Sequence, residues 1–349
     1  MMKLYNLGKV PWEESQLIYH ALADLGREGL VLLSPASPYV CIGFHQNAEQ
    51  EVDLAFCREQ GIPVFRREVG GGAVYLDGGQ LFFQLVLTPD DPRVPAPREA
   101  FYRKFLAPVV EIYRRTGVSA AYKPINDVIA GTRKISGSGV GEIGRGIVFV
   151  GNVIIDFNFA MMARVLKVPD EKFRDKVHKT LVANLSTLRC ELGAAGAAAW
   201  GEERLRALMI AEFAKLLGPF EAASIDPELQ SRMDALRPIL LSEAWLIQRR
   251  GRGAGRDIRI RAGVRMVHRV HKAKGGLLRA DFELKEGRFS GVSISGDFFC
   301  YPADAVRHIE AGLEGKHPTE VRGAVQDLRL RREFEIPGVS EDDWAVLFE

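Results

Sequence analysis

The chain has 349 residues, of which 47% are hydrophobic and 26% are charged, and its formal net charge is +2 at pH 7. This length accommodates two domains, or one large and one small domain, and the near balance of charge gives no argument for nucleic-acid binding. The four cysteines are widely scattered, which indicates neither a disulfide framework nor a zinc site. No run of about eighteen apolar residues occurs, and the start lacks a long apolar leader. We therefore expect a cytoplasmic protein with no membrane contact.

The first part of the chain predicts helices and strands in alternation. Residues 11–25 have apolar side chains at helical spacing, with Pro11 suited to the first turn and Gly26 to the end. Helices are also predicted at residues 49–60 and 98–116, and strands at 30–33, 39–44, 62–65, 73–76 and 81–87. A turn at residues 77–80 predicts that strands 73–76 and 81–87 pair as a β-hairpin.

The rest of the chain continues this pattern. Residues 127–139 predict a second hairpin around Gly131 and Thr132, residues 147–157 a strand, and residues 160–217 a mainly helical segment. Strands are expected at 258–260, 264–270, 277–284 and 289–294, and helices at 301–313 and 341–348. Successive antiparallel hairpins followed by helices predict an α+β fold, with a mainly antiparallel sheet flanked by helices. The polar, glycine-rich residues 249–256 predict a linker between a large domain, 1–248, and a small α+β domain, 257–349.

The most informative stretch, residues 66–75, reads Arg-Arg-Glu-Val-Gly-Gly-Gly-Ala-Val-Tyr. Consecutive glycines leave bare backbone amides that a ligand can approach closely. Arg66 and Arg67 precede them, and a guanidinium offers a planar fork of donors to phosphate or carboxylate oxygens. Together these features favour a bound anion, most simply a phosphate; the alternative is a glycine-rich hairpin with two solvated arginines. A Walker loop is excluded because no Gly-Lys-Ser/Thr follows, and a dinucleotide fingerprint is excluded because strand-like sequence follows.

A second stretch, residues 123–139, reads Lys-Pro-Ile-Asn-Asp-Val-Ile-Ala-Gly-Thr-Arg-Lys-Ile-Ser-Gly-Ser-Gly. With these two stretches in this order, the chain resembles the lipoate–protein ligase A family of the biotin and lipoate ligase superfamily. That family carries Arg-Arg-x-x-Gly-Gly-Gly-Ala-Val-Tyr/Phe, then Asn-Asp, then a lysine followed by x-Ser-Gly-Ser/Ala. The resemblance covers most of the chain. It makes residues 1–248 a catalytic domain and residues 257–349 an accessory domain, in which Gly-Asp-Phe at 296–298 resembles the end of a family strand.

The resemblance implies an ATP-dependent lipoate–protein ligase. Such an enzyme converts lipoate or octanoate and ATP to acyl-AMP and pyrophosphate. It then transfers the acyl group to a lysine of an acceptor lipoyl domain, in an E2 subunit, a glycine-cleavage H protein or a similar protein. Lys134 is implied as the catalytic residue, because an ammonium there would stabilise negative charge in both steps. Without the motif, Lys134 would be interpreted as a surface lysine of a hairpin.

The resemblance also implies the substrate contacts. The expected ATP-binding residues are Arg66, Arg67, Gly71, Gly72, Ala73, Val74, Tyr75, Asn126, Asp127 and Lys134. Lys134 and Gly72 are also expected at the lipoate. Asp127 is expected to contact the Mg²⁺ that accompanies ATP, because Mg²⁺ commonly uses one or two carboxylates together with phosphates. Two alternatives stay open: Arg66 as part of a structural ion pair, and the Asn-Asp pair as a turn that caps a strand.

The sequence departs from the family pattern at three places, which leaves the acyl preference and the acceptor open. Leu76 stands for a histidine, Gln80 for an asparagine, and Val150-Gly151-Asn152 for His-Gly-Thr. The nearest alternative function is an octanoyltransferase of the same fold, which takes its acyl group from acyl carrier protein through a cysteine thioester. The cysteine of that mechanism should lie shortly before residue 124, where this chain has Ala-Ala-Tyr. A non-catalytic lipoyl-domain-binding protein is a further alternative, which the presence of Lys134 disfavours.

Overall fold

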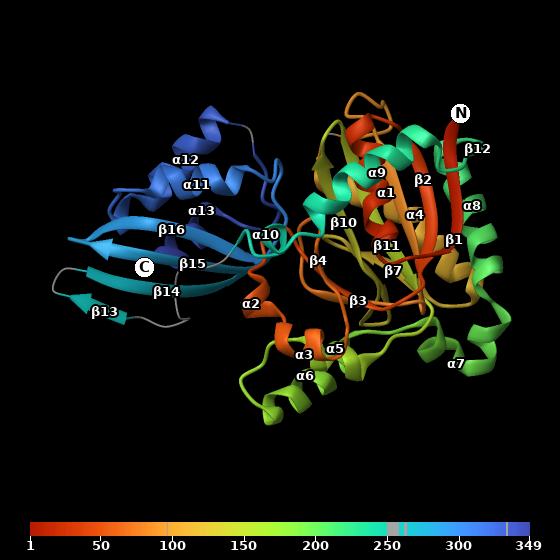
Figure 1. The fold of residues 1–349 in the computed structure, drawn as a ribbon, viewed down its shortest axis with the longest axis horizontal. Coiled ribbons are helices and arrows are strands. Elements are labelled where there is room, and N and C mark those ends of the chain that lie inside the picture. Colours follow the sequence, from red (N-terminus) through yellow and green to blue (C-terminus); the bar gives the residue numbers. More distant parts are fainter. Residues whose placement is uncertain (96, 250–257, 262–263, 333) are drawn as a thin grey trace. The chain divides into compact units, whose positions relative to one another are not determined.

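The computed structural model describes residues 1–95, 97–249, 258–261, 264–332 and 334–349 (Figure 1). The chain forms two compact units. The first unit contains Met1–Cys41, Asp53–Phe65 and Val74–Ser242, and the second contains Ile42–Val52, Arg66–Ala73 and Glu243–Glu349. The second unit thus includes two short segments from within residues 1–248. The domain limits drawn from the sequence stay a prediction, and the predicted linker, apart from Arg249, lies outside the described residues.

The first unit is built on a six-stranded sheet with the order β10-β11-β6-β2-β1-β12. These strands are β1 (Met2–Val10), β2 (Gly29–Pro35), β6 (Gln80–Leu87), β10 (Ser138–Ile143), β11 (Gly146–Ile154) and β12 (Phe220–Ala222). β1 runs parallel to β2 and β12, and the other neighbouring pairs are antiparallel. The predicted α+β fold class with a mainly antiparallel sheet is confirmed.

Helices cover both faces of this sheet because the side chains of a strand alternate between its two faces. On one face, Gln84 of β6 donates from Nε2 to the backbone oxygen of Ser15 in α1 (Glu14–Leu25) at 2.6 Å. On the other face, the ring of Phe83 lies 5.4 Å from the ring of Phe213 in α8 (Glu202–Leu217). Helix α4 (Arg98–Thr116) packs on α8, and α9 (Pro227–Leu240) packs beside α1 (Figure 1).

Two small sheets complete the strands of the first unit. One has the order β4-β3-β5, with β3 (Tyr39–Ile42), β4 (Val64–Arg66) and β5 (Val74–Leu76). The other has the order β7-β8-β9, with β7 (Ala120–Lys123), β8 (Asp127–Ala130) and β9 (Arg133–Ser136). The predicted hairpin around Gly131 and Thr132 is confirmed, since β8 pairs with β9 through the Ala130–Arg133 register. The remaining helices of this unit are α3 (Leu54–Glu59), α5 (Phe159–Val165), α6 (Glu171–Asn184) and α7 (Leu188–Ala199).

The predicted hairpin between residues 73–76 and 81–87 is wrong. β5 pairs with β3, with Tyr75 opposite Val40, whereas β6 lies between β2 and β11. Both edges of β6 are therefore occupied, so β5 cannot add to it. The intervening turn is held by Asp77, whose Oδ1 accepts from the Gly79 amide at 2.9 Å, and it redirects the chain from one sheet to the other.

The single helix predicted at residues 49–60 is also wrong, because two helices occur there. α2 (Ala48–Glu51) ends at Val52, and α3 begins after Asp53. The Asp53 carboxylate accepts from the Phe56 amide at 3.1 Å, so it acts as a new N-cap and separates the two helices.

The second unit contains a four-stranded antiparallel sheet with the order β13-β14-β15-β16. Its strands are β13 (Ile258–Arg261), β14 (Val264–Ala273), β15 (Gly276–Lys285) and β16 (Arg288–Asp297). Its helices are α2 (Ala48–Glu51), α10 (Glu243–Leu246), α11 (Ala305–Leu313), α12 (Val321–Arg331) and α13 (Glu341–Phe348). Helix α11 packs on β16, α13 packs on β14 and β15, and α12 packs on α11 and α13 (Figure 1). One core joins sheet and helices, including Val267, Phe282, Ile294, Val306, Ile309, Leu313, Trp344 and Phe348. The four strands predicted here are confirmed, whereas α12 was not predicted.

Two further observations concern the cysteines and the helices. Cys41, Cys57, Cys190 and Cys300 are free thiols, and only Cys190 among them is exposed. Burial, with a smaller contribution from Asp53, raises the pKa of Cys57 to about 11, so this thiol stays protonated near neutral pH. Within the described residues, no helix is both long and apolar enough to cross a membrane.

Candidate functional site

The predicted site residues fall in both units. Those of the second unit are Arg66, Arg67, Gly71, Gly72 and Ala73. Those of the first unit are Val74, Tyr75, Asn126, Asp127 and Lys134.

The β8–β9 hairpin of the first unit brings Lys134 and Asp127 together. Lys134 Nζ lies 2.5 Å from Asp127 Oδ1, and the two side chains are 34% and 28% exposed. The hairpin itself is fixed at its second strand, because the backbone oxygen of Lys134 accepts from the Ser186 amide at 2.7 Å. A partly exposed pair of this kind adds only about 0.2–1 kcal/mol to stability. The Lys134 ammonium is therefore available to an anionic substrate at little cost to the fold.

Asn126 is tied to the strand that follows Lys134. Its Nδ2 donates to the backbone oxygen of Ser138 at 2.6 Å, and Ser138 Oγ donates to the backbone oxygen of Asn126 at 2.8 Å. The Tyr113 hydroxyl donates to the backbone oxygen of Ile135 at 2.5 Å and accepts from the Ile154 amide at 2.9 Å. Burial raises the pKa of Tyr113, so its hydroxyl keeps its proton. These bonds fix the backbone on both sides of Ser136 and Gly137.

Two residues that the sequence analysis named only as departures from the family pattern lie beside this strand. Asn152 Oδ1 accepts from the Gly137 amide at 3.0 Å, and Asn152 Nδ2 donates to Gln80 Oε1 at 2.8 Å. Gln80 Nε2 in turn donates to the backbone oxygen of Tyr75 at 3.2 Å. Gly137, which follows Lys134 by three residues, and Tyr75, a predicted site residue, are thus connected through side chains to which no role was assigned. The sequence showed only that Asn152 replaces a threonine and that Gln80 replaces the shorter amide of an asparagine.

The glycine loop, residues 70–72 of the second unit, is held by backbone contacts. A Cβ on Gly43 would lie 1.8 Å from the oxygen of Gly71, and a Cβ on Gly70 would lie 2.5 Å from the oxygen of Phe298. The Gly71 amide donates to that Phe298 oxygen at 3.1 Å, and Gly71 has φ of 92°. The glycines are therefore required for close backbone approach and for a left-handed conformation.

Arg66 has a structural role in this unit. Its side chain is fully buried, and its guanidinium donates to the backbone oxygens of Gly43, Phe44, Gln46, Trp245 and Leu246 at 2.6–3.2 Å. Trp245 Nε1 returns a hydrogen bond to the Arg66 oxygen at 2.9 Å. Burial, with repulsion from Arg249, lowers the pKa of Arg66 to about 9. These contacts join two chain segments, and the assignment of Arg66 to ATP stays a prediction.

Arg67 differs from its neighbour because it contacts the glycine loop directly. Its Nη2 donates to the backbone oxygens of Gly70 and Gly72 at 2.7 and 2.9 Å, and the residue is only partly buried. The guanidinium thus turns the carbonyl oxygens of the loop toward itself. This arrangement fixes the loop and is compatible with the predicted contact to an anion.

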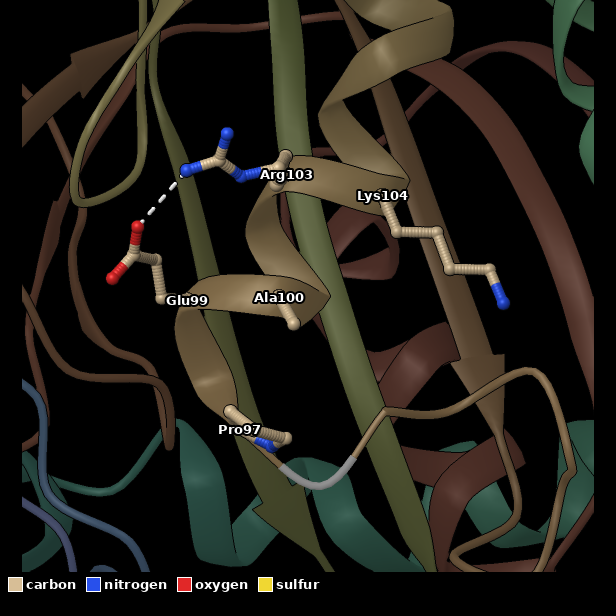
Figure 2. Close-up of a pocket in the computed structure, with 5 residues that line it drawn as sticks. All are labelled: Pro97, Glu99, Ala100, Arg103 and Lys104. Atoms are coloured by element: carbon tan, nitrogen blue, oxygen red, sulfur yellow. Dashed lines mark hydrogen bonds and ion pairs between the residues drawn. The ribbon is translucent and has the colours of Figure 1, made fainter.

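A surface pocket lies at the start of α4, and none of the predicted site residues lines it. Figure 2 shows its five lining residues, with Glu99 and Arg103 joined as an ion pair of 3.1 Å and with Lys104 directed away from them. Lys104 Nζ donates to the backbone oxygen of Arg93 at 2.6 Å. In the described ranges, no group of three or more His, Cys, Asp or Glu residues could hold a metal ion.

Comparison with known proteins identifies the family. Residues 10–214 match the model of the lipoyl protein ligase A/B catalytic domain, which is more than half of the chain. The chain belongs to this family. The resemblance found from the sequence motifs is therefore confirmed.

Several characterised relatives are similar to part of the chain. It is 37% identical over 161 residues to lipoate-protein ligase A subunit 1 of Thermoplasma acidophilum, which covers 42% of this chain and 60% of that protein. It is 34% identical over 154 residues to lipoate-protein ligase LplJ of Bacillus subtilis, which covers 43% of this chain and 44% of that protein. The chain thus spans about half the length of these two relatives. It is also 24% identical over 257 residues to octanoyltransferase LipM of Kyrpidia tusciae, with 67% of this chain and 91% of that protein covered.

Solved structures support the same fold. A bi-partite lipoate protein ligase of Thermoplasma acidophilum, described with its E2 lipoyl domain, matches with a TM-score of 0.61 and 26% identity over 71% of this chain and 96% of that chain. Lipoate-protein ligase A bound with ATP matches with a TM-score of 0.57 and 23% identity over 70% of this chain and 98% of that chain. LipL1 of P. falciparum, in complex with lipoate, matches with a TM-score of 0.67 and 18% identity over 96% of this chain and 95% of that chain.

Proposed function

We propose that the protein is an ATP-dependent lipoate–protein ligase. In the first step, a carboxylate oxygen of lipoate attacks the α-phosphorus of ATP, and pyrophosphate leaves. In the second step, the amine of an acceptor lysine attacks the carbonyl carbon of lipoyl-AMP, an amide forms, and AMP leaves. The observation that carries the proposal is the partly exposed pair of Lys134 and Asp127 on adjacent strands, 2.5 Å apart.

Lys134 suits both steps because each one develops negative charge on oxygen. An ammonium is a compact point charge, and the neighbouring residues Ser136, Gly137 and Ser138 are small. In this proposal, Lys134 contacts the lipoyl carboxyl and the α-phosphate, and Asp127 orients its ammonium until the substrate binds. The ammonium then acts as a preorganised donor, which typically contributes about 10²–10³ in rate.

The proposal includes Mg²⁺ that arrives with ATP as part of the substrate. Asp127 supplies one carboxylate at the hairpin, and phosphate oxygens would complete the ligand set, as Mg²⁺ commonly requires. The ion would neutralise charge on the phosphates.

The substrates and partners come from the similar proteins named above. Their names and descriptions include lipoate, ATP and an E2 lipoyl domain. We therefore propose lipoate or octanoate as the acyl substrate, and an E2 subunit, an H protein or a similar lipoyl-domain protein as the acceptor. A cytoplasmic location without nucleic acid or membrane partners completes the proposal.

The second candidate is an octanoyltransferase, and the similarity to the Kyrpidia tusciae protein favours it. The cysteines argue against it. β7, which occupies the expected thioester position, has no cysteine, and Cys41, Cys57 and Cys300 are buried. Cys190 is exposed, but it lies on α7, outside the two stretches that carry the motifs.

Two measurements test the proposal. The first is lipoate-dependent exchange of labelled pyrophosphate into ATP in the presence of Mg²⁺, which we expect for the wild-type protein. The second is mass spectrometry of an apo lipoyl domain supplied either with ATP and free acid or with octanoyl-acyl carrier protein. Modification only from ATP and free acid supports the ligase. Modification from the carrier thioester without ATP, lost in one of four single Cys→Ser variants, supports the transferase instead.

A further inference from the structure

Three hydrogen bonds form an unbroken line of amides in the first unit. The Gly137 amide donates to Asn152 Oδ1 at 3.0 Å, Asn152 Nδ2 donates to Gln80 Oε1 at 2.8 Å, and Gln80 Nε2 donates to the Tyr75 oxygen at 3.2 Å. All three bonds run in the same donor-to-acceptor direction. Hydrogen bonds in such a chain polarise and strengthen one another.

One end of this line lies at the lysine. A Cβ on Gly137 would be 3.9 Å from Lys134 Cε and 3.8 Å from Asn152 Oδ1, so the lysine stem and the Asn152 amide both lie close to the α-carbon of Gly137. Asn152 holds this turn through its backbone as well. Its oxygen accepts from Ser136 Oγ at 2.6 Å, and its amide donates to the Gly137 oxygen at 3.2 Å. A shift of Asn152 would therefore move the backbone over which Lys134 extends.

The other end of the line lies at β5. Tyr75 belongs to the stretch predicted to contact ATP, and Gln80 is only 1% exposed. β5 and β6 belong to different sheets, so no backbone ladder connects them. The Gln80 side chain contacts both the backbone of Tyr75 in β5 and the side chain of Asn152 in β11.

We propose that Gln80 and Asn152 are positioning residues, an amide relay that sets Lys134 relative to β5 for formation of the acyl-adenylate. The inference rests on the proposed function. Amides suit this task because each offers both a donor and an acceptor and stays uncharged at all working pH values. An aspartate at position 152 could not donate to Gln80 and would attract the lysine ammonium away from the substrate.

Variants at Gln80 and Asn152 test whether the line of hydrogen bonds positions Lys134. Gln80→Leu and Asn152→Ala should each lower kcat for pyrophosphate exchange about tenfold to hundredfold, because small misplacement of a catalytic group costs this much. The double variant should lose no more than the worse single variant, since both break one line. The exchanged pair Gln80→Asn with Asn152→Gln keeps the summed side-chain length and should recover part of the rate.

Gln84→Leu is the matched control. Gln84 is a second buried glutamine of β6, and its Nε2 donates to a backbone oxygen, that of Ser15. Its loss should lower the melting temperature as much as the loss of Gln80, but it should leave kcat unchanged. An equal fall of kcat in Gln84→Leu and Gln80→Leu would show that the effect comes from lost stability and not from positioning of Lys134. This result would overturn the inference.

Hydrogen exchange separates failure of the relay from failure of the proposed function. Gln80→Leu should speed exchange of the Gly137 amide, although Gln80 does not touch it, because Asn152 loses its anchor. This readout needs no substrate. Wild-type protein without pyrophosphate exchange activity would refute the ligase function and, with it, the relay's role in adenylation. Active wild type with unchanged kcat and unchanged Gly137 exchange in Gln80→Leu would refute the relay alone.

Discussion

The Lys134 hairpin and the glycine loop carry the two main motifs of the sequence, but they are held in different ways. Side chains hold the hairpin: Asn126, Ser138 and Asn152 donate to or accept from its backbone, and Lys134 and Asp127 keep partly exposed charges. Backbone contacts, together with the Arg67 guanidinium, hold the glycine loop, and the fully buried Arg66 supports the segments around it. A charged residue within a motif therefore need not contact a ligand. Burial decides which charge is available for chemistry.

The largest effect should follow the loss of Arg66. A buried carbonyl without its donor costs about 1–3 kcal/mol, and Arg66→Met removes the donor to five of them. We expect the free energy of unfolding to fall by about 4 kcal/mol or more, measured by urea denaturation. Arg66→Lys should also fail, because one ammonium cannot reach both chain segments. A variant that unfolds like the wild type but binds ATP poorly would show that Arg66 contacts ATP and is not needed for stability.

Lys134→Ala should lower activity strongly and leave stability nearly unchanged. Its melting temperature should stay close to that of the wild type, because the side chain is partly exposed and its ion pair contributes little. Pyrophosphate exchange should fall by about 10²–10³, the usual effect of losing one preorganised donor. Lys134→Arg should not restore the rate, since a planar fork does not replace a point charge. Activity within about threefold of wild type in the alanine variant would remove Lys134 from the proposed role.

Arg67→Ala tests the role of the guanidinium that contacts the glycine loop. Arg67 contacts the carbonyls of Gly70 and Gly72, so its loss should loosen the loop without exposing a buried charge. We expect the KM for ATP to rise about tenfold, in line with one or two hydrogen bonds from a charged group, and the KM for lipoate to change less. Steady-state kinetics with each substrate varied in turn measures both. A selective rise in the KM for lipoate would instead assign this arginine to the acyl site.

Acid should loosen the glycine-loop region more than the hairpin. Burial, with repulsion from Arg249 and Arg66, lowers the pKa of His45 well below its ordinary value of 6.5. The unfolded state then binds more protons than the folded state below about pH 6.5, so stability is complete above this pH and falls as the pH drops. Hydrogen exchange of the Gly71 amide should therefore be faster at pH 5 than at pH 7 after correction for intrinsic rates.

His45→Phe is the control for this pH effect. Phenylalanine cannot titrate, and it keeps a ring for the stacking on Phe298, where the centroids are 4.8 Å apart. The variant should lose the pH difference at Gly71. The same acid sensitivity in His45→Phe and in the wild type would assign the effect to another group.

Sequence patterns predicted those parts whose causes are local. The helix at residues 98–116 was predicted with its observed bounds, because apolar side chains recur at its helical spacing and Gly117 ends it in a left-handed conformation. The β8–β9 hairpin followed from its turn residues. The pairing of β5 with β3 was missed, because the choice of partner depends on which sheet edges are free, and a turn sequence does not encode this.

Only part of the candidate site could likewise be predicted from the sequence. The motif placed Lys134 and Asp127 on neighbouring strands, and the structure brings their charges to 2.5 Å. The burial of Arg66 could not be predicted, because its acceptors at Trp245 and Leu246 are distant in sequence. The Gln80–Asn152 contact joins β6 to β11 and was equally hidden, although both residues had been noted as unusual.

The bond from the Gly71 amide to the Phe298 oxygen has a consequence for biosynthesis. The ribosome makes Gly71 long before Phe298, so the Gly71 amide has no acceptor at this position while the intervening chain is synthesised. Contacts of such long sequence separation form late and slowly. A nascent chain that already contains the whole Lys134 hairpin still has an unfinished glycine loop. Synthesis of Phe298, rather than folding of the larger unit, therefore sets the earliest moment at which this bond can order the loop.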